Sequence, residues 1–226
     1  MEDRKANNPP QDVTIERLVR DLTPISRVWS PSTRFSAWLG LELVMIGVAT
    51  ARLGFRADAV EQLARLPFLL EVGLLGLAGA LLGWLALLAA VPGRGPRRTL
   101  VAAGILLALA SAGVMAMETP VAAPDRYDSL RTGIPCTISI VALASVPWLA
   151  LLLAQRRAAT LAPSLAGGLA GLAAFSLAAA LFRLVCPRNE LSHLLIWHLG
   201  PVALALVVST TIGRRWLGRW RLISPK

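Results

Sequence analysis

Side chains that carry out enzyme chemistry are scarce in this sequence. Its 226 residues include two cysteines and two histidines. The CxxC, HExxH, GxSxG and Walker patterns are all absent from it. A quinone-coupled thiol oxidase normally needs a CxxC pair to exchange disulfides with its partners, so this class is disfavoured. We therefore expect that the protein is not an enzyme.

Charged residues are missing from long stretches of the chain. Hydrophobic residues make up 55% of it, and a helix needs about 20 apolar residues to cross a bilayer. Strand-like alternation is absent, which disfavours a barrel. We predict an all-α, polytopic membrane protein, a bundle of six transmembrane helices in a lipid bilayer. The predicted spans are 35–51, 67–91, 99–117, 133–154, 158–182 and 191–213.

Arginine and lysine are distributed unevenly between the predicted loops. Sixteen of the 23 lie in the segments that would face one side of the membrane, which are 1–34, 92–98, 155–157 and 214–226. The positive-inside rule places this side, and with it both termini, in the cytoplasm. The formal net charge of +10 is thus explained by topology. Direct binding to nucleic acid is not expected.

These boundaries divide the chain into a cytoplasmic arm, 1–34, a six-helix membrane domain, 35–213, and a basic cytoplasmic tail, 214–226. The arm is polar, so no cleavable signal peptide is expected. It contains one short amphipathic helix, which Pro24 ends. The apolar stripe of this helix consists of Ile15, Leu18, Val19 and Leu22. A helix this short needs a surface to form against, and that surface is the bilayer, the bundle or a soluble partner.

The cysteines and histidines lie near the predicted outer ends of helices. Cys136 begins the fourth span, Cys186 ends the fifth, and His193 follows seven residues later. Two thiols and one or two imidazoles suit a soft or borderline metal ion, and Cys136, Cys186 and His193 are the candidate ligands. We expect no resident cofactor, only a transient soft metal ion. The thiols alone allow three states: a static disulfide, a redox- or metal-responsive pair, or two unpaired thiols.

Three further polar residues fall inside predicted spans. Carboxyl groups in the hydrocarbon region are costly unless they are paired, protonated or hydrated. Glu71 lies about 6 Å into its helix and is expected to reach the interface. Glu42 lies deeper, so we predict a packed hydrogen bond within the bundle. His198 is likewise expected to form a hydrogen bond inside the bundle.

Several segments, taken in order, resemble one family. They are IERLVRDLTPISRVWSP in the arm, the inner turn VPGRGPRR, Cys136 at a helix start, QRRAATLAP, CPRNELSHLLIW and the closing GRRWLGRW. In this order they resemble the NrsF type, the negative regulators of sigma-F. These are six-helix inner-membrane anti-sigma factors of proteobacteria. The zinc-binding motif of some other anti-sigma factors, in a cytoplasmic domain, is missing.

The resemblance implies a partner, a location and a signal. The partner would be an extracytoplasmic-function sigma factor, held at the bacterial inner membrane and released under heavy-metal or oxidative stress. Cys136 and Cys186 would sense that stress, and the stripe from Ile15 to Leu22 would dock on the sigma factor.

Other classes remain open on the sequence alone. A small metal or solute transporter would show metal uptake into vesicles. A membrane oxidoreductase would carry a bound quinone or haem. A structural membrane protein would contain the cysteines as a static disulfide.

Overall fold

The structure is a computed structural model that describes Glu16, Val19 and residues 29–119, 126–158 and 160–218. Its regular elements in the described ranges are all helices, and six of them are long and apolar enough to cross a membrane. The predicted all-α, six-span fold class is confirmed. The six are α2 (Pro31–Leu53), α4 (Leu66–Ala89), α5 (Arg98–Glu118), α6 (Arg126–Arg156), α7 (Pro163–Phe182) and a last helix, Leu191–Leu217.

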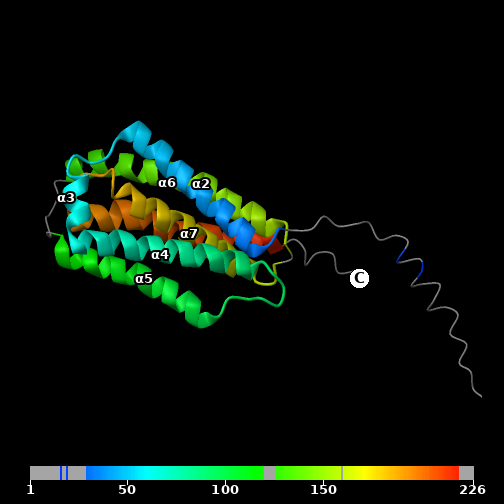
Figure 1. Cartoon of the computed structure of the whole chain (residues 1–226). Coiled ribbons are helices and arrows are strands. Elements are labelled where there is room, and N and C mark those ends of the chain that lie inside the picture. Colours follow the sequence, from blue (N-terminus) through cyan, green and yellow to red (C-terminus); the bar gives the residue numbers. More distant parts are fainter. Residues whose placement is uncertain (1–15, 17–18, 20–28, 120–125, 159, 219–226) are drawn as a thin grey trace, which may run out of the picture.

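The last span contains two kinds of helix. It consists of α8 (Leu191–His193), the π-helical turn η1 (Leu194–Leu199), α9 (Gly200–Ile212) and a second π turn, η2 (Gly213–Leu217). A short helix, α3 (Ala59–Ala64), follows α2 at the end of the bundle where most of its acidic residues gather. The start of α2 and the end of the described chain lie together at the opposite end (Figure 1). Their placement in the cytoplasm stays a prediction.

Helix boundaries follow local capping chemistry. The Ser30 side chain accepts a hydrogen bond from the Thr33 backbone N–H, and Pro31 occupies the first turn of α2. Both features favour a helix start. Gly54 ends α2 with φ of 77°, a left-handed conformation that suits glycine. The first span therefore begins four residues before the predicted boundary at 35.

The fourth span also begins earlier than predicted. Its helix starts at Arg126, not at 133, and continues through Pro135 and Pro147. The sequence assigned residues 118–132 to an acidic outer loop, and proline within a helix removes a backbone donor. In a membrane bundle neighbouring groups tolerate such a break. Cys136 therefore lies ten residues inside α6 instead of at its start.

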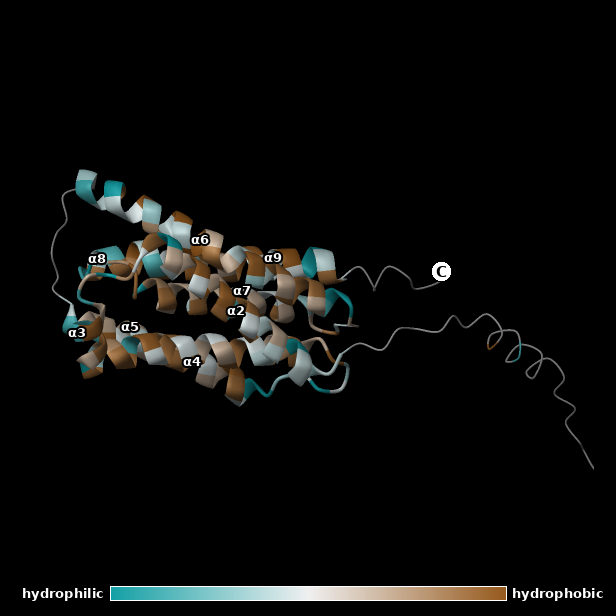
Figure 2. Cartoon of the chain, turned by 45° about the horizontal axis from the view of Figure 1, so that its top comes forward, coloured by the Kyte–Doolittle hydropathy of each residue, from teal (hydrophilic) through white to brown (hydrophobic). Residues whose placement is uncertain are grey.

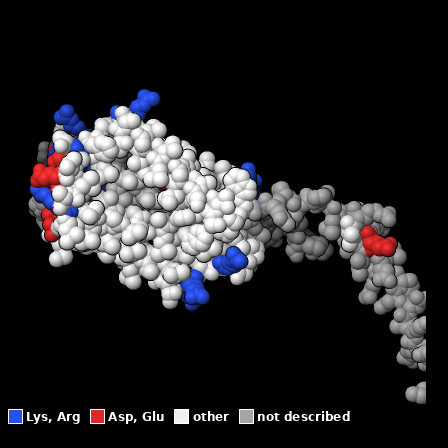
Figure 3. Space-filling view, viewed as in Figure 1, with Lys and Arg blue, Asp and Glu red and all other residues white. Residues whose placement is uncertain are grey.

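The core of the bundle is built around α7. It packs mainly on α4 and α9, with α6 also in contact. Close approach depends on small residues, because a Cβ added at Gly167 would lie 2.4 Å from the Ser209 carbonyl oxygen. Apolar residues cover the length of the helices, while hydrophilic ones gather at the two ends (Figure 2). In the view of Figure 3 the acidic residues of the bundle gather at the end that carries α3. This pattern is the one a lipid-embedded bundle requires.

Candidate functional site

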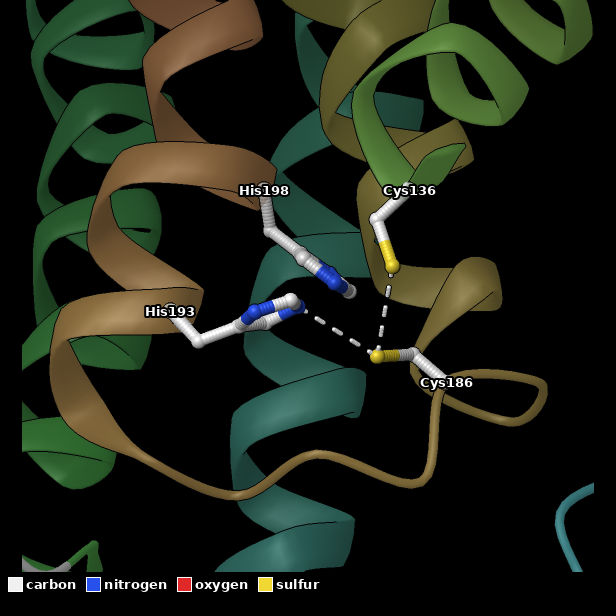
Figure 4. A group of neighbouring side chains, drawn as sticks. All are labelled: Cys136, Cys186, His193 and His198. Atoms are coloured by element: carbon white, nitrogen blue, oxygen red, sulfur yellow. Dashed lines mark hydrogen bonds between the residues drawn. The ribbon is translucent and has the colours of Figure 1, made fainter. Parts of the chain in front are cut away.

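Two thiols and two imidazoles meet near the α3 end of the bundle (Figure 4). Their potential ligand atoms, from Cys136, Cys186, His193 and His198, all lie within 4.8 Å of one another. The Cys136 and Cys186 Sγ atoms are 3.6 Å apart, and the Cys186 Sγ is 3.6 Å from His193 Nε2. Both cysteines are free thiols. We call these four residues the thiol–imidazole site.

Each cysteine is positioned by the backbone around it. Cys136 projects from α6 one residue after Pro135. Cys186 lies in the turn after α7, where its N–H donates to the Phe182 carbonyl oxygen at 2.8 Å. This bond continues the helical pattern for one more turn and points the thiol inward. The Cys186 side chain is consequently buried, with 2% of its surface exposed.

The π-helical turn η1 places His198 beside His193. Five residues make about 1.4 turns of an α-helix, which would put the two side chains on different faces. A π turn, with its i→i+5 hydrogen bonds, brings residues five apart onto one face. The two rings are 5.5 Å apart, centroid to centroid. Neither ring nitrogen of His198 forms a hydrogen bond with another described residue, contrary to our expectation for this residue.

Hydrogen bonds connect Cys186 to Cys136 and to His193. The hydrogen bond with Cys136 lowers the pKa of the Cys186 thiol; burial raises it, and the bond to His193 lowers it further, so the net direction is down. A thiolate is the reactive form of cysteine, both as nucleophile and as metal ligand. A lowered pKa thus favours the thiolate form at Cys186.

The prediction for Glu71 was wrong. Its side chain is buried instead of reaching the interface, and Arg183 donates to both carboxylate oxygens, from Nη2 to Oε2 at 3.2 Å and from Nε to Oε1. Arg183 lies in the turn after α7, which the sequence reading assigned to an outer loop. The residues are 112 positions apart, so no local pattern signals the pair.

The prediction for Glu42 was also wrong. The side chain is fully buried, as its depth in α2 suggested. Neither carboxylate oxygen, however, has a hydrogen-bond partner among the described residues. α2 packs on α4, α6 and α7, and apolar side chains dominate those faces. An ionised carboxylate there would be an uncompensated buried charge.

Little of the predicted docking stripe can be described. Val19 is helical and 59% exposed. Ile15, Leu18 and Leu22 lie outside the described residues.

Comparison with known proteins establishes the family. The family model described as NrsF, negative regulator of sigma F, matches residues 18–220. The chain belongs to the NrsF family. A relative named anti-sigma-F factor NrsF, from Caulobacter vibrioides (strain NA1000 / CB15N), is 35% identical over 157 residues, which is 66% of this chain and 68% of that protein. No solved structure matches.

The NrsF match covers the candidate site and part of the arm. All four residues of the thiol–imidazole site fall inside the matched range of 18–220. In the predicted docking stripe, Leu18, Val19 and Leu22 fall inside it and Ile15 lies before it. The resemblance inferred from the sequence is thereby confirmed at the level of the family.

Proposed function

We propose that this NrsF-family protein is a membrane-bound anti-sigma factor for an extracytoplasmic-function sigma factor, located in the bacterial inner membrane. It would release the sigma factor when a soft metal ion or an oxidant reacts with Cys136 and Cys186. One observation carries the proposal. All the cysteines and histidines of the chain, two free thiols and two imidazoles, converge at one end of the bundle.

The four side chains suit a tetrahedral soft metal ion. Zinc bonds of about 2.0–2.3 Å to nitrogen and sulfur place neighbouring ligand atoms about 3.3–3.8 Å apart. Two of the separations in the site are already 3.6 Å, and all are within 4.8 Å. Metal capture therefore needs a small inward movement and the loss of the thiol protons. The ion here is the signal, so a weak or transient site is sufficient.

An oxidant would act on the same pair. The Cys186 thiolate attacks one oxygen of hydrogen peroxide, and the O–O bond breaks to leave a sulfenic acid on Cys186 and hydroxide. The Cys136 sulfur then attacks the Cys186 sulfur, and the sulfenic hydroxyl leaves as water. In total, two thiols and one peroxide give one disulfide and two waters. The Sγ atoms close from 3.6 Å to about 2.05 Å.

The inner response would use the N-terminal arm. Its apolar stripe, Ile15, Leu18, Val19 and Leu22, would dock in a groove of the sigma factor as an amphipathic helix. The exposure of Val19 agrees with such a role. A signal that weakens this contact about 100-fold changes the binding free energy by about 2.7 kcal/mol, which is within the usual range for coupled sites.

The test is a pull-down of the tagged protein from its native membranes in mild detergent, before and after exposure to cadmium chloride or hydrogen peroxide. We expect mass spectrometry to identify a sigma factor in the untreated sample and its loss after treatment. Cys136→Ser and Cys186→Ser should retain it under both treatments. Absence of any sigma factor in either state would contradict the proposal. Cadmium uptake into proteoliposomes would then favour the transporter.

A further inference from the structure

Two buried arginines hold the turn that carries Cys186. We call residues 183–190 the sensor loop. Arg183 and Arg56 are 2% and 5% exposed, and both guanidinium groups lie over the Phe68 ring, at 5.1 and 5.7 Å from its centroid. Both also donate to Asn189 Oδ1, at 3.3 and 3.2 Å. Arg183 and Arg56 connect the sensor loop to two different helices.

Arg183 fastens the sensor loop to α4. Its guanidinium is paired with Glu71 of α4, and its Nη1 donates to the Arg188 carbonyl oxygen at 3.0 Å. The residue also forms the end of α7. Backbone bonds from Leu184, Val185 and Cys186 to the last turn of α7 add further support. The sensor loop thus remains attached to the central helices without Arg56.

Arg56 fastens the sensor loop to α2. It lies three residues after the end of α2, and its backbone N–H donates to the Leu184 carbonyl oxygen at 2.9 Å. Its side-chain Nη1 donates to the Cys186 carbonyl oxygen at 3.0 Å. The backbone of Cys186 is therefore in direct contact with a residue that lies just after α2.

Asp58 holds Arg56 in this position. Its carboxylate accepts two hydrogen bonds from Arg56, at 2.6 and 3.0 Å, and one from Gln62 at 2.9 Å. The Arg56 and then the Gln62 bonds hold the pKa of the Asp58 carboxyl well below its usual range. The carboxylate therefore stays ionised, and Arg56 stays oriented, at every pH above the range in which free aspartate titrates.

α2 is the span best suited to move. Only Trp38 and Glu42 are buried along its 23 residues. Its inner end packs through Phe35 and Trp38, and among the described residues one long-range hydrogen bond joins it to another helix, from Arg34 Nη1 to the Ala154 carbonyl oxygen at 3.2 Å. α2 is also the helix that directly follows the N-terminal arm in the chain. A displacement of its outer end would therefore disturb few buried side chains between that end and the arm.

We propose that Arg56 is the positioning residue that couples the sensor loop to α2. The inference rests on the proposed function in taking the cysteine pair as the place where the signal acts. Disulfide formation shortens the Sγ separation of 3.6 Å by about 1.5 Å. Hydrogen bonds weaken steeply over such distances. The Cys186 carbonyl therefore either carries Arg56 and the outer end of α2 with it or loses its bond to them. In both cases the packing of α2 changes.

The experiment compares two loop arginines in purified full-length protein in lipid nanodiscs. Arg56→Gln removes the guanidinium bonds to the sensor loop and leaves the backbone bond from residue 56 to Leu184 in place. Arg188→Gln is the matched control, because Arg188 belongs to the sensor loop itself but pairs with Asp128 of α6 and with Glu190. Diamide, an azodicarboxamide, takes the two thiol hydrogens onto its N=N bond and leaves the disulfide. Mass spectrometry counts the alkylatable thiols, and hydrogen–deuterium exchange is measured on peptides from residues 31–53.

Wild type and Arg188→Gln should show a change of about threefold or more in α2 exchange rates on oxidation. Arg56→Gln should lose both thiols to diamide at a rate near that of wild type, with α2 exchange unchanged. Normal oxidation of the thiols without a response in α2 would show that Arg56 transmits the change to α2 and does not merely stabilise the fold. Arg56→Lys provides a second variant in case Arg56→Gln does not fold. The lysine keeps the charge beside Asp58 but cannot bond Asp58 and the loop carbonyls together, so the α2 response should be reduced.

Two results would overturn the coupling: an α2 response in Arg56→Gln equal to that of wild type, or no α2 response to oxidation in wild type. Neither depends on a sigma factor. A failed pull-down combined with an Arg56-dependent α2 response would instead reject the proposed partner and leave the coupling intact.

Discussion

α7 and α2 are helices of similar length, 20 and 23 residues, placed very differently in the same bundle. Of the most apolar 18 residues of each, 83% are buried in α7 and 11% in α2. α7 is rich in glycine and alanine and contacts α4, α6 and α9. α2 presents larger side chains, and many of them are exposed on its outer face, where lipid would lie. α7 is therefore the packed central helix, whereas α2 is a peripheral helix that can shift with the loss of few buried contacts.

The thiol–imidazole site lies where these two helices are connected through the sensor loop. Cys186 follows α7 directly, and Arg56 brings the end of α2 to its carbonyl oxygen. A site placed between a tightly packed helix and a peripheral one can convert a small local closure into a change of packing.

The largest expected effect comes from removing the ion pair that holds the α7 end. Glu71→Gln leaves Arg183 as a buried charge without its carboxylate, and breaking such a pair costs about 3–5 kcal/mol. We expect a large loss of thermal stability of the purified protein in detergent. Glu61→Gln is the control, because Glu61 and Arg65 form an exposed pair worth about 0.5 kcal/mol or less. Equal stability of the two variants would contradict the buried-pair assignment.

A glycine exchange tests the packing difference itself. A Cβ at Gly167 of α7 would lie 2.4 Å from the Ser209 carbonyl oxygen, whereas at Gly47 of α2 nothing lies within 4 Å. Overpacking costs about 1–3 kcal/mol, so Gly167→Leu should lower the melting temperature clearly. Gly47→Leu should leave it nearly unchanged, as measured by fluorescence-detected size exclusion after heating. A matching loss in Gly47→Leu would show that α2 is packed as tightly as α7.

Metal titration tests whether His198, in the π-helical turn η1, is one of the metal ligands. We expect one cadmium ion per chain, detected by the ultraviolet thiolate-to-metal absorption band. His198→Phe should weaken binding about tenfold or more, because it removes one of four candidate donors. The His198 ring packs on Phe182, with centroids 5.7 Å apart, so an aromatic replacement preserves the packing. Unchanged affinity would exclude His198 from the donor set.

The smallest effect is expected at the second buried carboxyl. Glu42 has no hydrogen-bond partner among the described residues, so Glu42→Gln should change stability by about 0.5 kcal/mol or less. Thermal unfolding alongside Glu71→Gln makes the comparison direct. A loss as large as that of Glu71→Gln would reveal a strong partner for Glu42.

Sequence reasoning reached the fold because its signals are local. Runs of apolar residues give the spans, whereas the predicted start at 35 missed the cap formed by Ser30 and Pro31 at the start of α2. One error lies at the start of the fourth span. α6 begins at Arg126, within residues that the sequence assigned to an acidic outer loop, and continues through Pro135. Neighbouring segments of the bundle make such a break tolerable.

The candidate site was predictable only in part. The scarcity of cysteine and histidine singled out Cys136, Cys186 and His193, and the structure brings their side chains together. His198 was not among the three predicted metal ligands. Its position beside His193 depends on a π turn, which no residue pattern predicts. Arg56 and Arg183 were treated as loop charges, because their burial depends on partners more than 100 residues away.

The sequence by itself determined an all-helical bundle of six spans, the uneven distribution of charge between its loops and the family to which the chain belongs. Each of these follows from composition or order along the chain. Only the tertiary structure decided which polar groups meet: the two thiols 50 residues apart, Glu71 with Arg183, and Arg56 with the sensor loop. The physical reason is that burial makes an unpaired polar group costly, and its partner is chosen by helix packing and not by distance in sequence.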